Sequence, residues 1–341
     1  MIQLSSTSVE VKPNLSDWKS ILSQSNISTK ELLEYCQLES HPLASPSAED
    51  LFSLRAPVTY LEKIEKGNTN DPLLLQILPQ KHEHNSVTGF TDNPLNEDEY
   101  SPCKGLIHKY RSRVLLVMTS ACVINCRYCF RRAFPYQNHK QSKSDWHNAL
   151  DYVRQRTEVN EVILSGGDPL ILDNNYLFWL LSEIDKIEHI KRIRIHSRLI
   201  VSVPQRIDSD FLKQLRCISK DIIIVTHCNH ANELGDDVKA SIEALKLEGV
   251  TILNQSVLLK NVNDNATTLA QLSEALFDTG ILPYYLFLLD PVSGSAHFDI
   301  PKTRAQIIYQ QLLTILPGFL CPRLSVEIPG AESKTPVGPL A

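Results

Sequence analysis

Three features that mark other classes of protein are absent from this sequence of 341 residues. No apolar run approaches the roughly 20 residues that a membrane-spanning helix needs. The first residues have neither the basic region nor the apolar region of a secretory signal. Neither sign of charge dominates, since 34 Lys and Arg stand against 39 Asp and Glu, so we expect no nucleic-acid or membrane-surface partner. Together these absences predict a cytoplasmic protein.

The eight cysteines are not expected to form a disulfide framework, because the cytoplasm keeps thiols reduced. Five of them are scattered singly and fit the pattern of small buried hydrophobic residues. The other three, Cys122, Cys126 and Cys129, fall within eight residues. We therefore look for the function of the protein at this cluster.

The first hundred residues differ from the rest of the chain. The segment from Ser28 to Tyr35 predicts a short helix with a capping box between Ser28 and Glu31. Residues 66–72 and 89–94 are rich in turn-forming residues and predict connectors. We expect a helical N-terminal extension over residues 1–105, a main domain over 106–330 and a tail over 331–341.

From about Arg113 onward, short β-branched or apolar runs alternate with amphipathic stretches. The runs begin near Val114, Glu161, Arg192, Ile222, Thr251 and Pro283. Most starts lie about 30 residues apart, which is one strand–helix unit and predicts an α/β fold with a parallel sheet. Six units fall short of the eight of a closed barrel. A partial barrel and a doubly wound open sheet both fit this pattern.

Polar residues gather where these strands are expected to end. The three clustered cysteines follow the first strand, and Ser165-Gly166-Gly167-Asp168 follows the second. His196 follows the third strand and His227 the fourth, Gln255 lies within the fifth, and Asp290 follows the sixth. Parallel α/β folds place their chemistry at these ends, so the sequence predicts one site there.

The three clustered cysteines have the spacing C-x3-C-x2-C. A structural zinc site would normally need a fourth protein ligand, and the nearest candidate, His139, lies ten residues beyond Cys129, outside the residues that the structure describes. A [4Fe–4S] cluster accepts thiolates, and three of them leave one iron open to a substrate or cosubstrate. A structural zinc or iron–sulfur module remains the non-catalytic alternative.

The cysteine motif resembles that of the radical S-adenosylmethionine (SAM) superfamily, in which an aromatic residue, here Tyr128, precedes the third cysteine. The resemblance implies a partial (β/α)6 TIM-like barrel with the helical N-terminal extension in front of it. It also implies a [4Fe–4S] cluster, SAM and an external electron donor. Ser165, Gly166, Gly167 and Asp168 match the segment that contacts SAM in this superfamily.

Residues 105–336 resemble the lysine 2,3-aminomutase family within that superfamily. The shared stretches include residues 122–134, 165–169, 226–233, 253–259 and 290–298. The resemblance implies pyridoxal phosphate (PLP) held by Lys334 as a Schiff base, with Lys109 and Arg113 near its phosphate. A radical SAM enzyme that works on RNA or protein without PLP is the alternative.

The same resemblance implies which residues bind the amino-acid substrate. It places Arg131 on the substrate carboxylate, and Asp290 and Glu327 at positions that are acidic in lysine-specific members. His227 and Gln255 match further pocket positions. Glu327 departs from the aspartate of the catabolic enzymes and reaches one methylene further.

Two departures from the catabolic enzymes suggest a branch of the family: the short segment after Lys334, and Gly330-Ala-Glu-Ser in place of a run of glycines. Together with residues 56–74, they resemble the bacterial members that supply (R)-β-lysine for elongation factor P. That branch implies a functional link to an elongation factor P β-lysine ligase. A catabolic-type free-lysine mutase, or a mutase for another amino acid, is the alternative.

Overall fold

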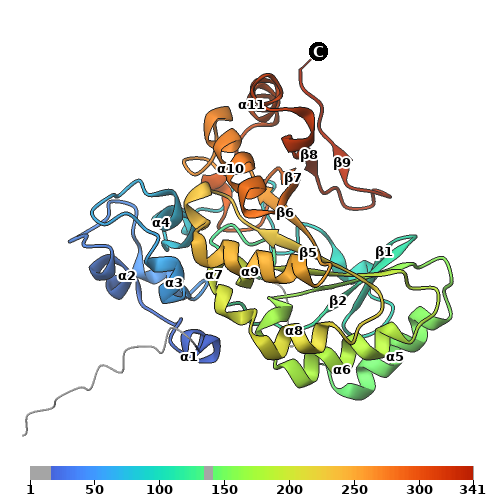
Figure 1. The fold of residues 1–341 in the computed structure, drawn as a ribbon. Coiled ribbons are helices and arrows are strands. Elements are labelled where there is room, and N and C mark those ends of the chain that lie inside the picture. The colour runs from blue at the N-terminus through green and yellow to red at the C-terminus, as the bar shows by residue number, and fades with distance from the viewer. Residues whose placement is uncertain (1–16, 134–140, 341) are drawn as a thin grey trace, which may run out of the picture.

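The computed structural model describes residues 17–133 and 141–340. Its N-terminal part contains the short helices α1 (Trp18–Ser23), α2 (Thr29–Tyr35), α3 (Val58–Leu61) and α4 (Pro72–Ile77). Ser28 and Glu31 exchange hydrogen bonds at the start of α2, so the predicted capping box is confirmed. The apolar side chains of these helices join the same buried core as the sheet. The four helices lie together at one side of the molecule (Figure 1). The proposed domain boundaries stay a prediction, and residues 1–16 lie outside the described residues.

In the described part of the chain, nine strands form one sheet in chain order. They are β1 (Leu106–Tyr110), β2 (Arg113–Val117), β3 (Glu161–Ser165), β4 (Arg192–Ser197), β5 (Asp221–His227), β6 (Thr251–Val257), β7 (Leu282–Phe287), β8 (Arg323–Val326) and β9 (Thr335–Pro336). Strands β2 to β8 are parallel, whereas β1 and β9 run antiparallel at the two edges.

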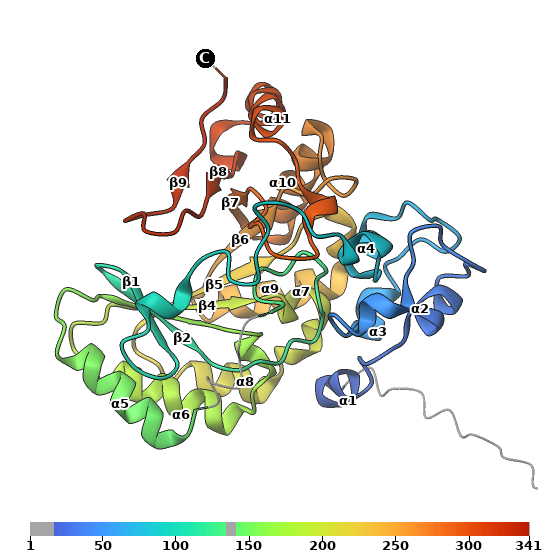
Figure 2. The same cartoon turned by 180° about the vertical axis from the view of Figure 1, so that it is seen from behind.

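Helices follow the parallel strands, as the alternating pattern predicts. They are α5 (Lys143–Arg154), α6 (Asn174–Asp185), α7 (Leu199–Ser202), α8 (Ser209–Leu215), α9 (Asp236–Leu247), α10 (Ala266–Thr279) and α11 (Lys302–Ile315). Helices α5, α6, α8 and α9 lie along the outer side of the curved sheet, and α10 and α11 lie beside β7 and β8 (Figure 2). Among the described residues, no helix is both long and apolar enough to cross a membrane.

Successive side chains of each strand point in turn to the apolar core and to an inner cavity. In β4, Ile193 and Ile195 are fully buried in the apolar core, while Arg192, Arg194 and His196 line the cavity. A parallel sheet that curves around a lined interior, with helices outside, confirms the predicted α/β partial barrel. The six predicted runs correspond to β2 to β7; the strands β1, β8 and β9 were not predicted.

The strands are slightly longer than the sequence indicates. Ser165, His196 and His227 were expected in loops, but Ser165 and His227 are the last residues of β3 and β5, and His196 is the next to last of β4. Gln255 lies within β6, as predicted, and pairs in register with His227. The strand ends therefore carry these side chains on a rigid frame rather than on loops.

Candidate active site

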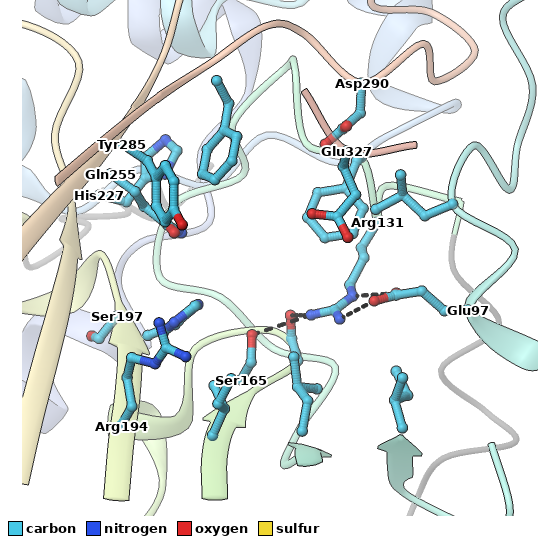
Figure 3. Close-up of a pocket in the computed structure, with 18 of the residues that line it drawn as sticks. Glu97, Arg131, Ser165, Arg194, Ser197, His227, Gln255, Tyr285, Asp290 and Glu327 are labelled. Carbon is cyan, nitrogen blue, oxygen red and sulfur yellow. Dashed lines mark hydrogen bonds and ion pairs between the residues drawn. The ribbon is translucent and has the colours of Figure 1, made fainter. Parts of the chain in front are cut away.

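A cavity of about 550 Å³ lies on the inner side of the sheet. It is lined by the cysteine loop, by residues of β1 to β7, and by side chains that follow β7 and β8. In Figure 3 the side chains of Asp290 and Glu327 lie together on one side, with Arg131 and Glu97 below them. His227, Gln255 and Tyr285 lie on the opposite side in this view. Every residue that the sequence predicted for the site lines this one cavity.

Cys122, Cys126 and Cys129 lie on the loop after β2 and face the cavity. Burial and the neighbouring thiols raise the pKa of Cys122 well above its usual range, and they raise that of Cys129 to about 11. A bound cationic centre would stabilise the thiolate forms of Cys122 and Cys129 against this effect. The described residues hold no set of three ligands converging on a single ion.

A buried ion pair fastens the cysteine loop to the N-terminal part of the chain. Arg127, which stands between Cys126 and Tyr128, is fully buried and donates to Glu83 at 2.9 and 2.6 Å. Arg132 donates to the same carboxylate at 2.7 Å. Glu83 belongs to a short 3-10 helix, Lys81–His84. The N-terminal extension therefore fixes the position of the cysteines.

The Gly-Gly-Asp segment packs directly on the start of the cysteine loop. A Cβ atom on Gly167 would come within 2.2 Å of the Ala121 carbonyl oxygen, and Gly166 has a φ of +119°. The Asp168 carboxylate accepts hydrogen bonds from Ser197 and from the amide of Leu199. Burial raises the pKa of Asp168, although these hydrogen bonds act to lower it. The glycines thus permit close approach; the SAM contact of this segment stays a prediction.

Tyr128 and His227 form one buried unit. Their rings stack at 5.7 Å, and the Tyr128 hydroxyl lies 2.9 Å from His227 Nε2. Burial and the charge of Arg198 lower the pKa of His227 to about 3, so the imidazole is neutral. Arg198 donates to the Tyr128 hydroxyl at 2.8 Å and to Cys126 Sγ at 2.6 Å. Arg198 was not predicted as a site residue, because its contact with the cysteine depends on folding.

Arg131 follows the cysteine loop and points into the cavity. Its guanidinium donates to both carboxylate oxygens of Glu97, at 2.8 and 2.6 Å, and to Ser165 Oγ at 3.2 Å. Glu97 begins the 3-10 helix Glu97–Tyr100 and was not predicted. This bidentate geometry is the one that a guanidinium offers to any carboxylate.

Glu327 and Lys334 are the first and last residues of the loop that joins β8 to β9. The Lys334 ammonium donates to Glu327 Oε2 at 2.7 Å and lies 4.4 Å from the centre of the Phe287 ring. Lys109 donates to Glu327 Oε1 at 2.9 Å, and the Tyr110 hydroxyl donates to the same oxygen. Burial opposes ionisation of Glu327, but the charge of Lys334 and these hydrogen bonds hold its pKa at about 2.

Asp290 lines the cavity near Glu327. Its pKa is raised to about 7, because burial disfavours the charged form and the charge of Glu327 is close. Among the residues described, no cation lies within ion-pairing distance of Asp290, and no carboxylate lies within that distance of Arg113. Asp290 and Arg113 thus line the cavity without an ionic partner among the described residues.

Arg194 of β4 was missed as a site residue, and His196 was placed at the end of the third strand without a role. Arg194 Nε and His196 Nε2 are buried without a protein hydrogen-bond partner. Burial, followed by the charges of Arg194 and Lys334, lowers the pKa of His196 well below its usual value. Buried polar atoms without a protein partner fit a cavity that binds a polar ligand. The alternating sequence Arg192 to His196 was the signal available.

Comparison with known proteins agrees with this site. Residues 116–272 match the family model described as "Radical SAM superfamily". The L-lysine 2,3-aminomutase of Escherichia coli strain K12 is 45% identical over 95% of this chain and 95% of its own length. That of Haemophilus influenzae is 44% identical over 94% and 95%. That of Clostridium subterminale is 33% identical over 95% of this chain and 78% of its own length.

Proposed function

The chain belongs to the L-lysine 2,3-aminomutase family of radical SAM enzymes, and we propose that it converts L-α-lysine to β-lysine by moving the α-amino group to C3. The observation that carries the proposal is that the cysteine triad and Lys334 open into the same cavity. A radical generated at the first and an amino acid held at the second would meet in this cavity.

Three bound groups are required. Cys122, Cys126 and Cys129 would hold a [4Fe–4S] cluster, Tyr128 and residues 165–168 would contact SAM, and Lys334 would hold PLP. When bound, the cluster with SAM supplies a radical that takes hydrogen from carbon, and PLP supplies a carbonyl carbon that carries the migrating nitrogen. Arg113 has no ionic partner among the described residues, which suits it to the PLP phosphate together with Lys109.

The residues of the chain bind and orient the substrate. Arg131 would exchange its bidentate contact with Glu97 for the substrate carboxylate, which has the same geometry. Asp290 and Glu327 supply the negative charge that favours an amino acid with a side-chain ammonium. His227 stays neutral and, with Gln255, lines the wall opposite these carboxylates. The buried Glu83–Arg127 pair keeps the cysteine loop fixed while these groups change partners.

We further propose that the product is (R)-β-lysine and that it is attached to elongation factor P by a partner ligase in the cytoplasm. Support comes from the resemblance to the elongation factor P branch. The relatives from E. coli and H. influenzae also align with this chain over 95% of their length. An external protein or small-molecule reductant would supply the electron. Feeding the product to elongation factor P and the ligase, and weighing the modified factor, tests this link.

The activity itself is tested by anaerobic turnover. Protein reconstituted with iron, sulfide and PLP would receive lysine, SAM and a strong reductant, and the products would be separated on a chiral column. We expect (R)-β-lysine, with loss of turnover in Cys126→Ser and retention in Cys217→Ser, whose thiol is exposed outside the cavity. The (S) product would move the protein to the catabolic-type branch. Cleavage of SAM without formation of β-lysine would show that lysine is not the substrate.

A further inference from the structure

Arg198 directly follows β4 and lies against the cysteine loop. One end of its guanidinium, Nη1, donates to Cys126 Sγ at 2.6 Å and to the Tyr128 hydroxyl at 2.8 Å. The other end, Nη2, donates to Gln76 Oε1 at 2.9 Å and to Glu233 Oε2 at 2.8 Å. Arg198 is only 7% exposed, and Glu233 is fully buried. The buried cation therefore faces a cysteine sulfur at one end and a carboxylate at the other.

The backbone at Arg198 is held independently of its side chain. The Asp168 carboxylate accepts hydrogen bonds from the amides of Arg198 and Leu199, at 2.8 and 2.9 Å. The Ser197 hydroxyl donates to the same carboxylate at 2.8 Å. Asp168 belongs to the segment that packs on the start of the cysteine loop. A different side chain at position 198 should therefore leave the backbone where it is.

The charge beside Cys126 bears on an electron that enters a cluster bound there. Arginine stays charged in proteins, and a positive charge favours the form of the cluster that carries one more electron. Hydrogen bonds to the sulfurs are among the features that set the reduction potential of an iron–sulfur cluster. The carboxylate of Glu233 acts in the opposite sense, because it cancels part of the charge of Arg198.

We propose that Arg198 is a positioning residue that makes the cluster easier to reduce through its contact with Cys126, and that the charge of Glu233 limits this effect. The proposal rests on the function proposed above for one point, that the three clustered cysteines hold a [4Fe–4S] cluster. The external reductant gives one electron to that cluster, and no proton leaves Arg198. Both residues lie outside the cysteine motif, and 35 positions separate them in the chain.

The first test is a redox titration of the reconstituted full-length protein without SAM, PLP or lysine, followed by electron paramagnetic resonance. We expect Arg198→Met to lower the equilibrium constant of reduction at least about tenfold, which is a shift of about 59 mV for one electron. Arg198→Lys keeps the charge and should recover part of this loss. Glu233→Gln should shift the potential in the opposite direction, to less negative values, which general damage to the site would not do.

Arg206→Met is the matched control. Arg206 is also fully buried, but its guanidinium donates to the carbonyl oxygens of Leu170 and Leu172 and does not line the cavity. This variant should keep the potential of the wild type. Equal shifts in Arg198→Met and Arg206→Met, or shifts of the same sign in Arg198→Met and Glu233→Gln, would overturn the proposal. An unchanged potential together with weaker binding of SAM would assign Arg198 to SAM instead and would overturn it too.

A wild-type measurement covers the case in which the variants do not fold. Protein made with arginine that carries ¹⁵N in its guanidinium group would be reduced and studied by pulsed electron paramagnetic resonance. We expect a ¹⁵N coupling to the reduced cluster, and its absence would overturn the contact. Protein that binds no iron–sulfur cluster would overturn this proposal and the proposed function together. The expected shifts without any β-lysine would leave the role of Arg198 standing and refute the proposed substrate.

Discussion

Replacing Gly167 with alanine tests how the cysteine loop is held. A Cβ at this position would lie 2.2 Å from the carbonyl oxygen of Ala121, 2.7 Å from its carbonyl carbon and 2.9 Å from its nitrogen. All three are backbone atoms, so no side-chain rotation relieves the clash. The backbone would have to separate by roughly 1 Å to restore ordinary contact distances.

The loss of stability follows from the backbone hydrogen bonds that this separation would weaken. Gly167 N donates to Thr119 O at 2.6 Å, and Asp168 N donates to Ala121 O at 2.8 Å. Overpacking costs about 1–3 kcal/mol, and each weakened hydrogen bond adds about 1 kcal/mol. We expect Gly167→Ala to lower the free energy of unfolding by roughly 3–5 kcal/mol. Because Ala121 precedes Cys122, the iron content after reconstitution should fall as well.

Two glycines provide matched controls in the same assays of urea unfolding and iron content. Gly318 has open space around it and no positive φ, so Gly318→Ala should stay within about 0.5 kcal/mol of the wild type. Gly249 has open space but a φ of +78°, so Gly249→Ala should cost about 1 kcal/mol from backbone conformation alone. A Gly167→Ala protein as stable as Gly318→Ala, with full iron content, would refute the reasoning.

Three further predictions concern charged groups. Glu83→Gln should lower the free energy of unfolding by about 3–5 kcal/mol in urea, because it leaves the buried Arg127 without its carboxylate. Asp290 has a pKa of about 7, so pairing with the substrate ammonium should release a proton near pH 6.5. Titration calorimetry in buffers of different ionisation enthalpy should detect this proton in the wild type and not in Asp290→Asn. Lys334→Ala should abolish the absorbance of protein-bound PLP, and an unchanged spectrum would exclude Lys334 as its attachment point.

Much of the scaffold could be predicted because its signals are local. The strands from β2 to β7 are short apolar runs spaced by single helices, and their ends carry the cysteines, Ser165 and Asp290. The edge strands escaped prediction because β1 and β9 are stabilised by their neighbours and not by a pattern of their own. Strand β8 has only four residues, Arg323–Val326, too few for a period to show.

The partners of the site residues could not be predicted, because folding brings them together from distant positions. Lys109 and Glu327 are 218 residues apart in the chain. Glu97 sits in a turn-rich segment whose sequence gives no sign that it faces Arg131. The contacts that these residues make could therefore be named only from the structure.

The most direct test of the central claim is to follow the nitrogen itself. Lysine labelled with ¹⁵N at the α-amino group would be turned over anaerobically with SAM, PLP and reductant, and the β-lysine analysed by mass spectrometry and NMR. An amino migration within one molecule predicts that all the ¹⁵N appears on C3, even in the presence of unlabelled ammonia. Unlabelled nitrogen at C3, or SAM cleavage with no β-lysine, would contradict the account.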